Sequence, residues 1–174
     1  MFTKGFAEDA LAVMEDYRLL SSLLPPVKGM ERDYYYFSYA RKAMSLSDTV
    51  CRQKGEDSIH FILASLLWPV VEERAKAQDF EAALAKTLDE TAVRYGFRDG
   101  ERERLEELLR LENALTSRYV AGEAENIAAS AHFAEGMLIL EARALRDEKA
   151  AQMLTLWRTV KPAPAAEGEA HRAA

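Results

Sequence analysis

The stretch IHFILASLLWPVV, residues Ile59 to Val71, decides the fold because it is apolar on nearly every side. At 3.6 residues per turn its large side chains point in all directions around a helix, so no face is left for water. It is also interrupted by Pro69 and shorter than the roughly 20 residues that cross a bilayer, so no membrane partner is expected. The pattern predicts a central helix over residues 57–76 that other helices must cover.

Amphipathic helices are predicted on both sides of this stretch, because apolar residues recur there at three- and four-residue steps. In the first segment, Phe6 to Leu24, the stripe expected to face the core is Phe6, Ala10, Val13, Tyr17, Leu20 and Leu24. Further helices are expected over residues 33–55, 80–95, 100–120 and 123–159, the last with a break near residues 146–149. Residues 161–174 contain two prolines and no apolar periodicity, which predicts a disordered tail. We therefore expect one all-α domain over residues 1–160, with about six helices around the apolar helix at residues 59–71.

Composition agrees with this fold and limits the function. The 174 residues are 49% hydrophobic and 30% charged, and 8 Gly and 5 Pro are few for a turn-rich β-sandwich. The 23 Lys and Arg against 29 Asp and Glu give a net charge of −6, which argues against general nonspecific binding to nucleic acid. The single Cys51 cannot form an internal disulfide and no apolar leader opens the chain, so a cytoplasmic location is expected.

Two carboxylates fall where the apolar pattern expects core residues: Glu112 in segment 100–120 and Glu135 in segment 123–159. Burying either one without a partner would be costly. One interpretation is a structural carboxylate paired with arginine, for which Arg110, Arg118 and Arg143 are candidates. The alternative is a metal site of Glu112, His132 and Glu135. The His and Glu here run in the reverse order of the Glu-x-x-His pattern of dimetal bundles, so no metal is expected.

The middle of the chain resembles a known family. Residues Ala43 to Glu72, AMSLSDTVCRQKGEDSIHFILASLLWPVVE, are similar to the part of bacterial poly(A) polymerases and CCA-adding nucleotidyltransferases that follows the catalytic head. That part has a helix, a short polar turn and an apolar helix of the form F-x-x-A-x-L-L-W-P. The matching residues are Phe61, Ala64, Leu66, Leu67, Trp68 and Pro69.

The resemblance continues into the C-terminal half, so that it covers roughly residues 15 to 158. The run SAHFAEGMLILEARAL, Ser130 to Leu145, looks like the family's apolar helix that ends in Arg-Ala, and Trp157 lies where a late Trp is common. The family's basic residues beside the Phe of this run are replaced by His132 and Ala134. Fewer cations imply weaker contact with phosphates.

The resemblance implies the helical, RNA-gripping part of such an enzyme without its catalytic head. No Gly is followed by Ser and no Asp-x-Asp occurs, so the metal ligands of the head are absent and no activity is expected from this chain alone. ATP and Mg²⁺ would belong to the head, and no cofactor is expected here. A head in the same longer chain is one partner that the resemblance suggests.

RNA, either tRNA or an mRNA 3′ end, is the other expected partner, held by phosphate contacts. From the placement of charge, the candidate contacts are Arg118, Arg143, Arg146, Lys149, Arg158 and Lys161, with Arg41, Lys42, Arg52 and Lys54 as a second group. The alternative is a helical protein–protein interaction module that has lost RNA binding.

Overall fold

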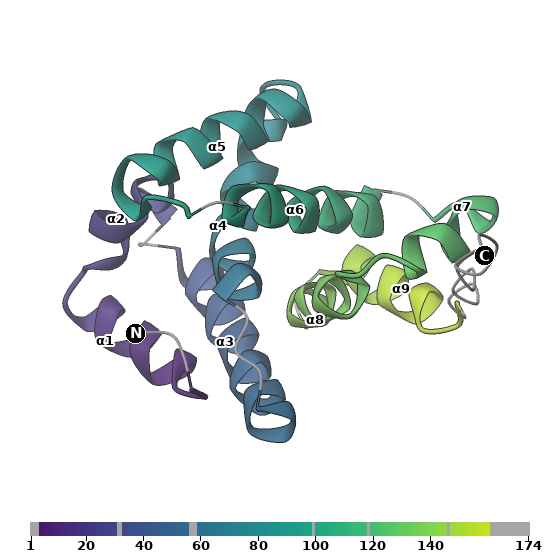
Figure 1. The fold of residues 1–174 in the computed structure, drawn as a ribbon, viewed down its shortest axis with the longest axis horizontal. Helices are drawn as coiled ribbons and strands as arrows, with labels where there is room; N and C mark the ends of the chain where they lie inside the picture. The colour runs from purple at the N-terminus through teal and green to yellow at the C-terminus, as the bar shows by residue number, and fades with distance from the viewer. Residues whose placement is uncertain are drawn as a thin grey trace, which may run out of the picture.

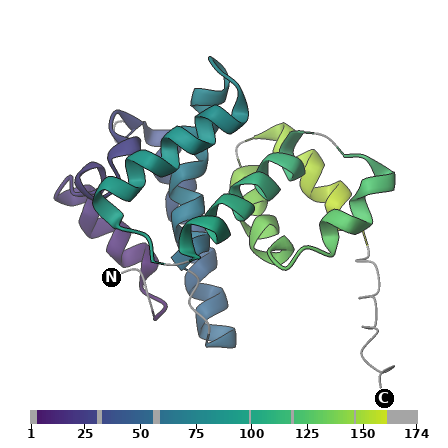
Figure 2. The same cartoon turned by 45° about the horizontal axis from the view of Figure 1, so that its top comes forward.

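The computed structural model describes residues 4–30, 33–55, 59–98, 100–117, 119–145 and 147–160, and within these ranges the fold is all-α, with no strand. The helices are α1 (Ala7–Asp16), α2 (Leu20–Leu23), the 3-10 helix η1 (Pro25–Val27), α3 (Tyr34–Lys54), α4 (Ile59–Ala75), α5 (Phe80–Tyr95), α6 (Glu101–Ser117), α7 (Ala121–Ala128), α8 (Phe133–Ala144) and α9 (Glu148–Trp157). Figures 1 and 2 place α7, α8 and α9 at one end of the molecule and α1, α2 and α5 at the other, with α3 and α4 between them. The predicted tail lies outside the described residues.

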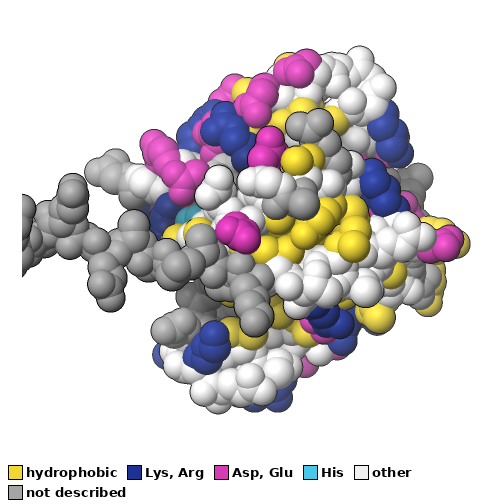
Figure 3. Space-filling view, turned by 90° about the vertical axis from the view of Figure 1, so that its right-hand side faces the viewer, with side chains coloured by type: hydrophobic (Ala, Val, Ile, Leu, Met, Phe, Trp, Pro, Cys, Tyr) yellow, Lys and Arg dark blue, Asp and Glu magenta, His cyan; other side chains and the backbone are white. Residues whose placement is uncertain are grey.

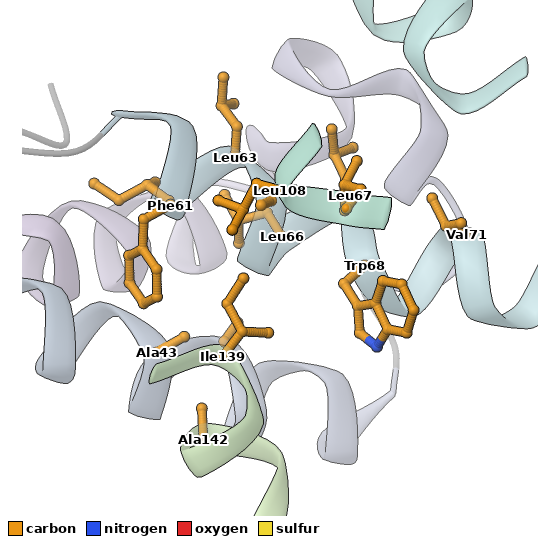
Figure 4. Packing of buried hydrophobic residues seen from close by; sticks show 14 of the residues in the cluster. Ala43, Phe61, Leu63, Leu66, Leu67, Trp68, Val71, Leu108, Ile139 and Ala142 are labelled. Atoms are coloured by element: carbon orange, nitrogen blue, oxygen red, sulfur yellow. The ribbon is translucent and has the colours of Figure 1, made fainter. Parts of the chain in front are cut away.

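Helix α4 is the predicted central helix, and its burial is confirmed. Residues from Phe61 to Trp68 are all buried, and Trp68 is only 2% exposed. Figure 4 shows side chains from three other helices around it: Ala43 from α3, Leu108 from α6, and Ile139 from α8. None of the helices in the described ranges is long and apolar enough to span a membrane.

The expected helix over residues 6–24 is instead two helices. Of its predicted buried stripe, Leu20 and Leu24 are buried as expected, but the part on α1 was wrong, since Phe6, Val13 and Tyr17 are exposed. The helix is interrupted after α1, where Arg18 adopts a left-handed backbone conformation with φ of 52°. The face of α1 that packs inward carries Ala7, Leu11 and Met14. A residue distant in sequence orients α1 so that this face is buried. The Asp48 carboxylate on α3 accepts hydrogen bonds from the first two amides of α1, at 2.7 and 3.0 Å.

The expected helix over residues 123–159 is three helices. The predicted break near residue 147 is present, because Asp147 accepts a hydrogen bond from the amide of Ala150 and so caps the N-terminus of α9. A second break at residues 129–132 was missed. There the amide of His132 donates to the Ser130 hydroxyl at 3.3 Å, which is a local alternative to helical bonding. The described ranges therefore hold more helices than the six or so expected.

Candidate functional site

A buried ion-pair cluster lies where α4, α6 and α8 meet, and Arg143 is at its centre. Its Nη2 atom lies 2.6 Å from Glu72 Oε1 and 3.0 Å from Asp147 Oδ2, and its Nη1 atom lies 3.4 Å from Glu112 Oε1. The side chain of Glu112 is fully buried and that of Arg143 is 10% exposed. The interpretation of Glu112 as a structural carboxylate paired with arginine is confirmed, with Arg143 as the partner.

Burial dominates the electrostatics of this cluster. Removal from water raises the pKa of Glu112 to about 8, although the Arg143 guanidinium opposes the rise. Burial also raises the pKa of the Tyr39 hydroxyl, and Glu112 beside it adds to the rise. The guanidinium carbon of Arg143 lies 5.4 Å from the centre of the Trp68 ring, in cation–π contact. At neutral pH the cluster therefore holds a protonated Glu112 next to a charged arginine.

Stability should decrease as the pH rises from about 5 to 8, because of Glu112. Its pKa is about 8 in the folded chain against an ordinary value of 4.5, so between these values the folded state binds the extra proton. Raising the pH then favours unfolding, by at most about 1.4 kcal/mol per pH unit. Urea unfolding at several pH values should show this slope in the native chain but not in Glu112→Gln, which cannot titrate. Parallel profiles for the two chains would rule out the raised pKa.

Two hollows lie beside Arg143, of about 260 and 240 Å³, and both are lined by Trp68, Glu72 and Asp147. Asp33 adds a further carboxylate to the first, and Lys149 adds a cation to the second. The Arg143 guanidinium is already bonded to three carboxylates. This arrangement does not favour a phosphate at Arg143, although the sequence pattern placed it among the RNA contacts.

A larger hollow of about 470 Å³ lies between α3, α4, α6 and α8, and its charge is different. We call it the basic hollow. Lys54 of α3 and Arg104 of α6 line it, and neither has an ion-pair partner among the described residues. Its apolar lining is Val50, Phe61, Ala131, Ala134 and Leu138, and Ser47, His132 and Glu135 complete it. Here cations and an apolar wall face the same space.

Two histidines lie at or near the basic hollow. His132 lines it with Glu135, whose Oε2 atom is 2.9 Å from His132 Nδ1, and Glu107 lies 3.6 Å from His132 Nε2. Burial lowers the pKa of His60, and the charge of Arg104 lowers it further.

The alternative metal set of Glu112, His132 and Glu135 is not brought together, since Glu112 bonds to Arg143. Within the described ranges no three His, Cys, Asp or Glu side chains are placed to hold a metal ion.

The other predicted cations are scattered. Arg41 is paired with Glu15, and Arg158 with Glu141. Arg52 donates to the backbone oxygen of Asp48, while Lys42 is half-buried and Lys149 is exposed. Arg118, Arg146 and Lys161 lie outside the described residues. Figure 3 shows the side formed by α7, α8 and α9, where basic and acidic side chains alternate around a hydrophobic patch.

Arg104 is the one cation of the basic hollow that the sequence did not suggest. It lies in a segment of alternating charge, which is typical of a solvated face. Of the three hollows described above, the basic hollow is the one whose lining carries a net positive charge. Compared with protein-family models and with curated protein sequences, the chain matches none.

Proposed function

We propose that this chain binds RNA through the basic hollow and does not act on it chemically. The observation that carries the proposal is that Lys54 and Arg104 line the same hollow as an apolar wall, where they outnumber its single carboxylate, Glu135. Lys54 and Arg104, which have no ion-pair partner in the described part of the chain, can release counterions from a phosphate backbone more effectively than arginines in carboxylate clusters can. The resemblance of the sequence to the helical part of poly(A) polymerases supports the same proposal.

The basic hollow is suited to a single strand better than to a duplex. A volume of about 470 Å³ admits an unstacked nucleotide, and the apolar lining offers a surface against which a base can pack. Lys54 and Arg104 then meet the adjacent phosphates. Because the chain carries a net charge of −6, binding depends on these few local cations and is expected to be weak.

RNA binding should be salt-sensitive and should depend on Lys54 and Arg104. In filter binding at about 50 mM salt, with oligo(A) and tRNA as probes, the Lys54→Ala/Arg104→Ala chain should bind at least ~10-fold more weakly than the native chain. The slope of log affinity against log salt should fall by about 1 to 2, because two phosphate contacts are lost.

The matched control is Lys86→Ala/Arg94→Ala on α5. It removes the same charge from two exposed residues that do not line the basic hollow. Equal weakening in the two double variants, binding indifferent to salt, or no retention at low salt would each refute the RNA proposal. The last result would favour the alternative of a protein interaction module.

A further inference from the structure

Helix α1 has two apolar faces, and only one is used by the fold. The inner face carries Ala7, Leu11 and Met14, which are at most 1% exposed. The second face, which we call the outer stripe, consists of Phe6, Ala10, Val13 and Tyr17. Of these, Phe6 is 60% exposed, Val13 43% and Tyr17 72%. These residues follow one another at three- and four-residue steps, so they form a continuous line along the helix.

The outer stripe is held in a fixed position. The amides of Ala7 and Glu8 donate to the buried carboxylate of Asp48 on α3, and the inner face packs into the core. Arg41 on α3 is bonded to Glu15 near the other end of α1. A helix anchored at both ends and along its inner face presents its other apolar face as a rigid surface, which is the preorganised arrangement that favours binding.

One edge of the outer stripe along helix α1 is acidic. The described helix α1 has no Lys or Arg, and Lys4 and Arg18 lie beyond its ends. Of its four carboxylates, Glu8 and Glu15 lie on the side away from the outer stripe. Asp9 and Asp16 are both exposed and seven residues apart, so they lie on the same side of the helix, next to the outer stripe. An apolar line edged by carboxylates is complementary to an apolar line edged by cations.

We propose that the outer stripe of α1 is the docking surface for a basic amphipathic helix of a partner protein. Phe6, Val13 and Tyr17 contact the apolar face of the partner helix, and Asp9 and Asp16 meet its Lys or Arg side chains. A partner helix of about three turns matches the roughly 15 Å length of α1. This surface is independent of the basic hollow and of the proposed RNA binding.

The acidic edge argues against other occupants. A second copy of this chain docked stripe to stripe would bring the carboxylates of two α1 helices together, and like charges at an interface are costly. An anionic membrane or a nucleic acid would be repelled in the same way. A basic helix is the occupant that satisfies both the apolar stripe and its edge.

The test is a selection of displayed helical peptides against the full chain. The peptides share Leu at the apolar positions and vary at the flanking positions among Lys, Glu and Ser. We expect Lys to be enriched at the flanks. In fluorescence anisotropy, a selected peptide should bind Val13→Ser/Tyr17→Ser at least ~10-fold more weakly than the native chain. It should also lose binding to Asp9→Lys/Asp16→Lys, to which the matched Glu-flanked peptide should then bind.

Val93→Ser on α5 is the control, because Val93 is 79% exposed and lies on a different helix. Equal binding of the selected peptide to the native chain and to Val13→Ser/Tyr17→Ser would overturn the proposal. So would enrichment of Glu or Ser at the flanks, or failure of the charge-reversed pair to bind. Sedimentation showing self-association that Val13→Ser/Tyr17→Ser abolishes would overturn it in favour of a second copy.

Discussion

Trp157→Ala should lower the free energy of unfolding by about 4 kcal/mol, because a fully buried indole at the end of α9 would be replaced by a cavity. The Trp157 ring packs edge-to-face against Tyr119 at 5.2 Å and Phe133 at 6.0 Å, between ring centroids. Its Nε1 atom also donates to the backbone oxygen of Leu115 on α6, at 3.0 Å. The loss therefore includes apolar burial, two aromatic pairs and a hydrogen bond that ties α9 to α6.

Urea unfolding followed by far-ultraviolet circular dichroism measures this loss. Trp157→Phe keeps a ring but not the donor, so it should cost less, about 1 to 2 kcal/mol. Leu156→Ala is the control, since Leu156 is the neighbouring residue and is 43% exposed. A cost for Trp157→Ala no larger than that of Leu156→Ala would mean that α9 is not held in this way.

The sequence predicted the centre of the fold well because the signal there is local and strong. A helix with no polar face can only be interior, and Asp79 and Gly96 cap α5 where the pattern placed its ends. Which face of α1 is buried could not be predicted in the same way. Its sequence offers two apolar stripes, and the choice between them is made by Asp48, which is some forty residues away in the chain.

The partners of the charged residues could not be predicted from the sequence either. Glu112 could be identified as buried because it interrupts an apolar stripe, but choosing Arg143 over Arg110 requires the packing of α6 on α8. Arg110 in fact bonds to Glu81 and Glu106 on the exposed side. Similarly, Lys54 and Arg104 share the basic hollow only because α3 and α6 approach the same part of α8. Periodicity gives the face of a helix, whereas the partners of a charged side chain depend on tertiary structure.

Arg143→Met should lower the free energy of unfolding by about 3 kcal/mol at pH 7, because the buried Glu112 carboxyl loses its charged hydrogen-bond donor and Trp68 loses its cation–π contact. Glu72 and Asp147 are 45% and 39% exposed, so water can replace Arg143 for them but not for Glu112. The guanidinium lowers the pKa of Glu112, so its removal should raise that pKa above 8. The folded variant then keeps the proton to a higher pH, and the cost of Arg143→Met should grow further above pH 8.

A double-mutant cycle with Glu112→Gln separates this effect from simple loss of packing. The two substitutions together should cost less than the sum of their separate costs, by at least about 1 kcal/mol, because the buried carboxyl is gone. Arg158→Met is the matched control: its pair with Glu141 has side chains 59% and 37% exposed, and breaking it should cost under about 1 kcal/mol. Additive costs in the cycle, at pH 7 and above pH 8 alike, would show that Arg143 stabilises the bundle by packing on Trp68 and not through its contact with Glu112.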